Sequence, residues 1–159
     1  MTHQWDSIEW RKMRDKCLYK WFMGDQHAIQ CFVDISTIVE TWDDLIDKDE
    51  VTDKDINYAF DACFIHLPRN PFYMKFRHML EPLIIMSVNA YHDSETMVKR
   101  DDESSRMMSF YIRNIGLELV PMIAFCIGGY DHMRKISMAA RDFFIHETYE
   151  EWEHRHDAA

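Results

Sequence analysis

The amino-acid sequence predicts an all-α protein on three observations. Glycine and proline together account for only eight of the 159 residues. No stretch alternates apolar and polar residues between turn residues, as a half-buried strand would. Helix-start signals recur along the whole chain. A chain of this length can bury one sizeable core without disulfide bonds, so we expect a single domain over residues 1–159 that folds as a bundle of about six helices.

The helices are expected from caps and breakers along the chain. The first begins near Asp6 or Ser7 and stops at Gly24, and Asp25 caps the second, which continues to about Asp49. The first half of this second helix is apolar nearly all round, so we expect it to be buried on every side. The six expected helices span residues 6–23, 25–49, 52–67, 71–100, 106–127 and 131 to the C-terminus.

The later helices have equally specific signals. Thr52 with Asp55 resembles a capping box, and the third helix then ends before a PRNP turn in which Asn70 caps the fourth helix. Pro82 should kink or break that fourth helix. Gly128 and Gly129 should terminate the fifth.

A stripe of carboxylates lies at the end of the second helix. At about 100° per residue, the four acidic side chains of ETWDDLID fall on one face: Glu40, Asp43, Asp44 and Asp47. The opposite face is an apolar arc made of Ile35, Ile38, Val39, Trp42, Leu45 and Ile46. Carboxylates one turn apart repel when ionised, so the stripe must be either solvated or neutralised by cations.

Two further groups of polar residues stand in apolar surroundings. In the fourth helix, MLEPLIIMSV is followed on one face by Asn89, His92, Asp93 and Thr96, with Arg100 a turn later. Two helices that change from buried to polar could bring two polar faces to one end of a bundle. In the fifth helix, Arg113, Asn114 and Glu118 must either pair internally or line a cavity, and we expect pairing.

The charge and the cysteines limit the partners. A net charge of −10 argues against binding to nucleic acid or to an anionic membrane surface, and it favours a metal ion or a basic protein partner. Polar residues interrupt every apolar run before about 18 residues, so no membrane span is expected. The cysteines stand singly in apolar contexts, as buried thiols of a reducing, cytoplasmic compartment would: Cys17, Cys31, Cys63 and Cys126.

The WDDLID segment resembles the DDxxD motif of class I isoprenoid (terpenoid) synthases, including the squalene and phytoene synthase branch. The resemblance implies a reduced terpenoid-synthase-like bundle in which Asp43, Asp44 and Asp47, with Glu40 nearby, bind Mg²⁺ and a prenyl diphosphate. Such a site suits Mg²⁺, which prefers oxygen ligands and bridges carboxylates to phosphates.

That family also needs a second metal-binding helix. NIGLE, residues 114–118, resembles part of the second motif of phytoene synthases, with Glu118 in place of an aspartate. Alternatively, Asn89 and Asp93 resemble the start of the Asn/Ser/Glu motif of terpene cyclases, although Met97 replaces its glutamate. The resemblance makes Asp93 and Glu118 further candidate metal ligands. The candidate substrate-binding residues are Asn89, His92, Arg100, Arg113 and Asn114.

Two other enzyme families share part of the pattern. All-α nucleoside triphosphate pyrophosphohydrolases use i, i+3 acidic pairs, which Glu40–Asp43 and Asp44–Asp47 resemble. HD-domain phosphohydrolases would use His66, His92 and Asp93.

A noncatalytic function is the alternative to these enzymatic functions, and it is the interpretation we favour. The chain is short and rich in aromatic residues, and it lacks a complete second motif. We therefore expect a small helical interaction protein that binds a basic partner or a second copy of itself. Its compact and unusual composition suggests that it is encoded by a virus. A Mg²⁺-dependent enzyme acting on a diphosphate is the alternative.

Overall fold

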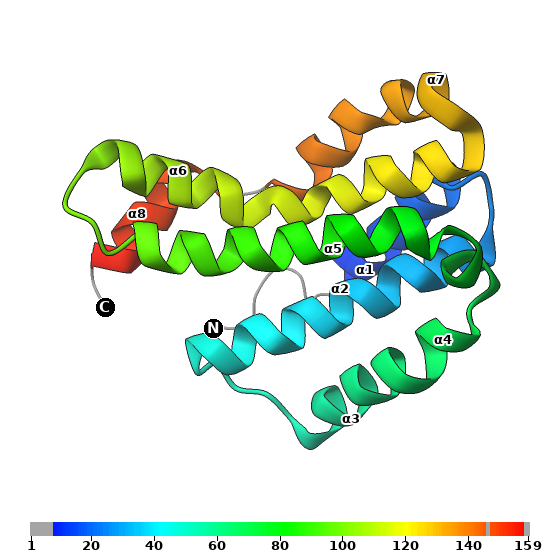
Figure 1. Ribbon diagram of the computed structural model, residues 1–159, viewed down its shortest axis with the longest axis horizontal. Coiled ribbons are helices and arrows are strands. Elements are labelled where there is room, and N and C mark those ends of the chain that lie inside the picture. The colour runs from blue at the N-terminus through cyan, green and yellow to red at the C-terminus, as the bar shows by residue number, and fades with distance from the viewer. Residues whose placement is uncertain (1–7, 146, 158–159) are drawn as a thin grey trace. The chain divides into compact units, whose positions relative to one another are not determined.

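The computed structural model describes residues 8–145 and 147–157. These residues form helices joined by short turns and contain no strand, which confirms the all-α class. The expected count of about six helices is not confirmed, because several helices are interrupted. The chain divides into two compact units, Met1–Arg77 and His78–Ala159, and each is described by itself. Figure 1 shows the helices in chain order.

The first unit opens with α1 (Ile8–Trp21) and α2 (Gln26–Asp47). Between them, Gly24 adopts a φ of +77°, a conformation that costs glycine little, and its amide donates to the Tyr19 carbonyl at 2.8 Å. The expected stop at Gly24 is confirmed.

The cap expected at the start of α2 is also confirmed. The Asp25 carboxylate accepts hydrogen bonds from the His27 and Ala28 amides, each at 3.0 Å. It thereby satisfies two amides that would otherwise lack a partner in the first turn. The expected beginning of the first helix, at Asp6 or Ser7, lies outside the described residues.

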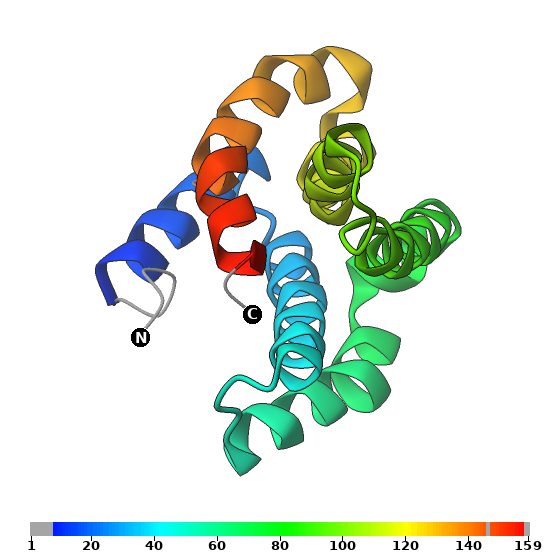
Figure 2. The ribbon, with the colours of Figure 1, turned by 90° about the vertical axis from the view of Figure 1, so that its left-hand side faces the viewer.

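A second arm of this unit runs back along α2. It consists of α3 (Asp53–Asp61), the π-helical turn η2 (Ala62–His66) and the short α4 (Leu67–Arg69). In Figure 1 α3 runs antiparallel to α2, and in Figure 2 it lies beside the C-terminal end of α2. Thr52 and Asp55 form the expected capping box.

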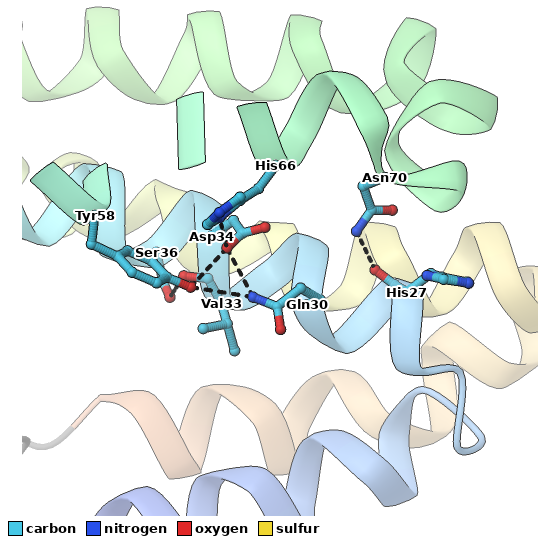
Figure 3. A network of polar contacts seen from close by, with 8 residues as sticks. All are labelled: His27, Gln30, Val33, Asp34, Ser36, Tyr58, His66 and Asn70. Carbon is cyan, nitrogen blue, oxygen red and sulfur yellow. Dashed lines mark hydrogen bonds and ion pairs between the residues drawn. The ribbon is translucent and has the colours of Figure 1, made fainter. Parts of the chain in front are cut away.

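Asn70 closes this arm and begins α5 (Pro71–Met97). Its Oδ1 accepts from the Phe72 and Tyr73 amides at 2.9 and 3.1 Å, as expected of an N-cap. Its Nδ2 donates to the His27 carbonyl at 2.9 Å, which ties the arm to α2 (Figure 3).

The second unit is built on the rest of α5 and on α6 (Glu103–Arg113). Pro82 lies inside α5 without dividing it into two helices. The two helices lie side by side in both views (Figures 1 and 2), and the Ser109 hydroxyl donates to the Ser94 carbonyl at 2.8 Å. Small buried side chains at this contact allow the helices to approach closely.

The expected fifth and sixth helices are divided differently. After α6 come the 3₁₀ turn η3 (Asn114–Glu118) and α7 (Leu119–Phe144). The break expected at Gly128 and Gly129 appears inside α7 as a kink, with Gly129 at a φ of +76°.

A further helix, α8 (Tyr149–Asp157), corrects the expectation of one helix from residue 131 to the C-terminus. The Thr148 amide donates to Glu151 at 2.9 Å, and the Glu151 amide donates to the Thr148 hydroxyl at 3.2 Å. This capping box starts a new helix. The T-x-x-E spacing of this box, Thr148 to Glu151, is present in the sequence.

One expectation about burial in the first unit is wrong. The first half of α2 is not buried on every side, because His27 and Gln30 are exposed. The apolar arc is only partly covered: Ile35 is buried, whereas three of its members are exposed, namely Val39, Leu45 and Ile46. Helical periodicity locates an apolar face but does not show how much of it a neighbour covers.

The cysteines are all free thiols, but not all are buried. Cys31 is buried and Cys17 and Cys126 are half-buried, whereas Cys63 is exposed. Cys63 belongs to η2, whose outward side carries several apolar residues, so its apolar neighbours in sequence did not indicate a core position.

One window within Glu103–His154 has a mean hydropathy of 1.5 and is long and apolar enough, by composition, to cross a membrane. A third of that window is buried, and core helices of soluble proteins have the same properties. This window therefore decides neither for nor against a membrane span.

Candidate functional site

A buried carboxylate links the two arms of the first unit. Asp34, in the middle of α2, has no exposed surface. Its Oδ1 accepts hydrogen bonds from Gln30 Nε2 at 2.9 Å and from Tyr58 Oη at 3.0 Å, and His66 Nδ1 lies 3.5 Å away (Figure 3). Its Oδ2 is buried and has no hydrogen-bond partner among the described residues. Burying a carboxylate costs free energy unless polar groups pair with it. Here Gln30, Tyr58 and His66 all approach Oδ1.

The π-helical turn brings two of these groups into line. In an α-helix, His66 would be rotated by about 80° from Tyr58, eight residues earlier. A π turn closes over five residues and therefore rotates less per residue. His66 ends η2 on the same side as Tyr58, and the two rings meet edge to face with centroids 5.5 Å apart. The turn thus directs both side chains to Asp34.

The electrostatics of this cluster favour a structural role. Burial, and then the hydrogen bond to Asp34 and its charge, raise the pKa of Tyr58, which keeps the phenol protonated as a donor. The His66 side chain is 39% exposed, and an imidazolium there would neutralise the buried carboxylate. Because these polar groups converge on Oδ1, the cluster acts as a clasp that holds α3 and η2 against α2.

The opposite side of the same segment is apolar and exposed. We call it the outer face, and it consists of Ile56, Phe60, Cys63 and Phe64. Phe60 and Phe64 are 61% and 65% exposed, and their ring centroids lie 4.7 Å apart. Tyr58 and His66 thus face the neighbouring helix, while Phe60 and Phe64 face solvent. Contiguous exposed apolar surface of this kind marks interaction sites.

Negative charge borders the outer face along the chain. Residues 40–61 contain nine carboxylates and two lysines, so this segment carries a charge of −7 of the chain's −10. Asp53, Asp55 and Asp61 lie on α3 itself and are exposed. The first unit therefore combines an apolar patch with an acidic surround.

The predicted carboxylate stripe lies within one continuous helix. Because α2 extends to Asp47, its four acids keep the expected helical spacing, with Asp43 and Asp44 half-buried and Glu40 and Asp47 exposed. Over residues 8–145 and 147–157, no three His, Cys, Asp or Glu side chains converge as a metal-binding group.

The predicted polar residues of α5 belong to the second unit. Asn89 Nδ2 donates to Asp93 at 3.1 Å, one turn along the same helix, and His92 is exposed. Arg100 follows α5 in an exposed turn. The structure therefore pairs Asn89 with Asp93. His92 is exposed on the same helix, and Arg100 lies in the turn after it.

The polar trio of the expected fifth helix pairs internally, as predicted. Arg113 lies 3.8 Å from Glu95, and Asn114 Nδ2 donates to the Phe110 carbonyl at 2.9 Å. Glu118 accepts two hydrogen bonds from Arg141 Nη2, at 2.6 and 2.7 Å, and a third from Nε at 2.9 Å. Each member of the trio therefore has a partner within the second unit.

The clasp was not predicted from the sequence of α2. A usable signal was present, because Gln30 and Asp34 stand four residues apart in an otherwise apolar stretch. Tyr58 and His66 could not be assigned to the clasp, since their alignment depends on a π turn that no residue pattern announces.

Comparison with protein-family models, curated proteins and solved structures found no match for this chain.

Proposed function

We propose that this protein is a noncatalytic interaction module that binds a basic, amphipathic helix of a partner protein on its outer face. The observation that carries this proposal is the exposure of Phe60 and Phe64, at 61% and 65%, on a segment whose Tyr58 and His66 point toward Asp34. The clasp fixes that orientation, so the aromatic pair is presented on a rigid support.

The chemistry of the surface defines the partner. Aromatic side chains at the centre of an interface contribute much of the binding energy, and surrounding charges steer the approach of a partner of opposite charge. A helix with apolar residues on one face and lysine or arginine at its edges would cover the phenyl rings. Its charges would meet the carboxylates of residues 40–61.

The test is a fluorescence-anisotropy titration of the full chain with a labelled helical peptide of leucine and lysine. The control peptide has glutamate at every lysine position. We expect the basic peptide to bind at least about tenfold more tightly, and higher salt to weaken its binding.

Paired variants make this test specific to the outer face. Phe60→Ser/Phe64→Ser should weaken binding of the basic peptide by about tenfold or more, since buried aromatic anchors dominate such interfaces. The matched control Ile85→Ser/Met86→Ser removes two exposed apolar side chains of α5 and should leave binding unchanged. Equal binding of both peptides, or equal losses in both variants, would refute the proposal.

The second candidate function is binding of Mg²⁺ and a diphosphate at the carboxylate stripe. It is supported by the helical spacing of Asp43, Asp44 and Asp47 on α2 and by the half-burial of the first two. Calorimetric titration of Mg²⁺ with inorganic diphosphate tests it. Binding that Asp43→Ala/Asp44→Ala abolishes would favour this candidate, and absence of Mg²⁺-dependent binding would remove it.

A further inference from the structure

The second unit contains a small hollow with basic walls. Its volume is about 200 Å³, and it lies between the turn at residues 98–101, Arg106 of α6, and Trp152 and Glu153 of α8. The turn, the helix that follows it and the sequence-distant α8 therefore contribute to it. Trp152 is only 1% exposed, so the hollow has a rigid aromatic wall.

Positive charge predominates at this hollow although the chain as a whole is acidic. Lys99, Arg100 and Arg106 line it together with two acids. One of these acids, Glu153, is already paired, because Arg106 Nη1 lies 3.5 Å from it and Tyr149 Oη donates to it at 2.8 Å.

The two cations of the turn contrast with that pair. Lys99 and Arg100 form no ion pair with any described residue. The second acid that lines the hollow is Asp101, an exposed residue of the same turn. Asp102, which comes next, does not line the hollow and is the N-cap of α6, accepting from the Ser105 amide at 2.8 Å.

We infer that this hollow binds a phosphate group, carried by a soluble molecule or by a lipid headgroup. Lysine and arginine form short, charge-assisted hydrogen bonds to phosphate oxygens. The volume is below the roughly 300–1,000 Å³ of pockets that enclose whole ligands, so the hollow suits a phosphate or diphosphate group and not an entire nucleotide. This site is independent of the outer face.

The test uses the full chain in two assays. Calorimetric titration with inorganic diphosphate in EDTA, without divalent cations, measures the soluble source. Sedimentation with phosphatidylcholine vesicles, with and without phosphatidic acid, measures the lipid source. Lys99→Ala/Arg100→Ala should weaken the observed binding by about tenfold or more, because two charge-assisted contacts are lost.

A matched variant separates the site from general electrostatics. Arg134→Ala/Lys135→Ala removes an equal number of positive charges from exposed neighbouring residues on α7. It should change the affinity by less than about twofold, because isolated surface charges contribute little. Diphosphate binding lost only in the turn variant supports a soluble ligand, and vesicle binding lost only there supports a lipid. No binding in either assay, or equal losses in both variants, would overturn the inference.

Discussion

The two units hold a peripheral segment by opposite kinds of contact: α8 in the second unit, and the arm formed by α3 and η2 in the first. In the second unit, α8 packs on α6 through Phe110, Tyr149 and Trp152, whose ring centroids lie 5.6–6.0 Å apart, with Trp152 almost fully buried. In the first unit, α3 and η2 attach to α2 through polar contacts with Asp34, and Phe60 and Phe64 face solvent. Aromatic residues thus build the core at one place and a surface at the other. The proposed recognition role of the exposed pair rests on this difference.

The largest expected effect is loss of the aromatic core contact. Trp152→Ala should lower the free energy of unfolding by about 3–5 kcal/mol, because it removes a large buried side chain and leaves a cavity. The comparison substitution Phe64→Ala should cost less than about 0.5 kcal/mol, since its ring is exposed. Urea unfolding followed by far-UV circular dichroism measures both. Similar losses would mean that Phe64 is a core residue and would break the comparison.

The clasp should have a smaller but measurable effect. Asp34→Ala should lower the free energy of unfolding by about 1–3 kcal/mol, because Gln30, Tyr58 and His66 lose their shared acceptor while part of each can turn to water. Asp34→Asn keeps an acceptor oxygen and should cost less. In both variants the pKa of Tyr58, followed by its ultraviolet absorbance, should fall toward 10.0 as the carboxylate's contribution is lost. Unchanged stability and an unchanged titration would show that the clasp does not hold this arm.

The sequence predicted the parts of this structure that depend on local chemistry. The turn at Gly24 and the caps at Asp25, Thr52 and Asn70 were recognisable because each requires a particular side chain at one position. The exposure of Phe60 was not predictable, since helical periodicity assigns such residues to a core unless the neighbouring helix is known.

The candidate site was also predictable only where it depends on local sequence. The spacing of the carboxylates in α2 could be read from the sequence, because it depends on one helix alone. The clasp could not, because it joins residues 24 and 32 positions apart through a π turn.

The smallest expected effect concerns a feature that both arms share. Asp55 and Glu151 complete the capping boxes of α3 and α8, and the hydrogen bonds from Thr52 and Thr148 lower the pKa of each carboxyl. A lowered folded-state pKa gives stability that is present above the unfolded value, 3.8 for Asp55, and is lost as the pH falls through the folded value. Asp55→Asn and Glu151→Gln should therefore each reduce the acid sensitivity of unfolding. If only one substitution did so, the two caps would not be equivalent.

Hydrogen exchange with and without the leucine–lysine peptide tests the central claim most directly, because it locates the binding surface on the unmodified chain. We expect the peptide to slow amide exchange in α3 and η2, residues 53–66, and in the acidic end of α2, and to leave α6 and α8 unchanged. Slowed exchange confined to the second unit, or no change in residues 53–66 at saturating peptide, would contradict the assignment of the outer face as the binding surface.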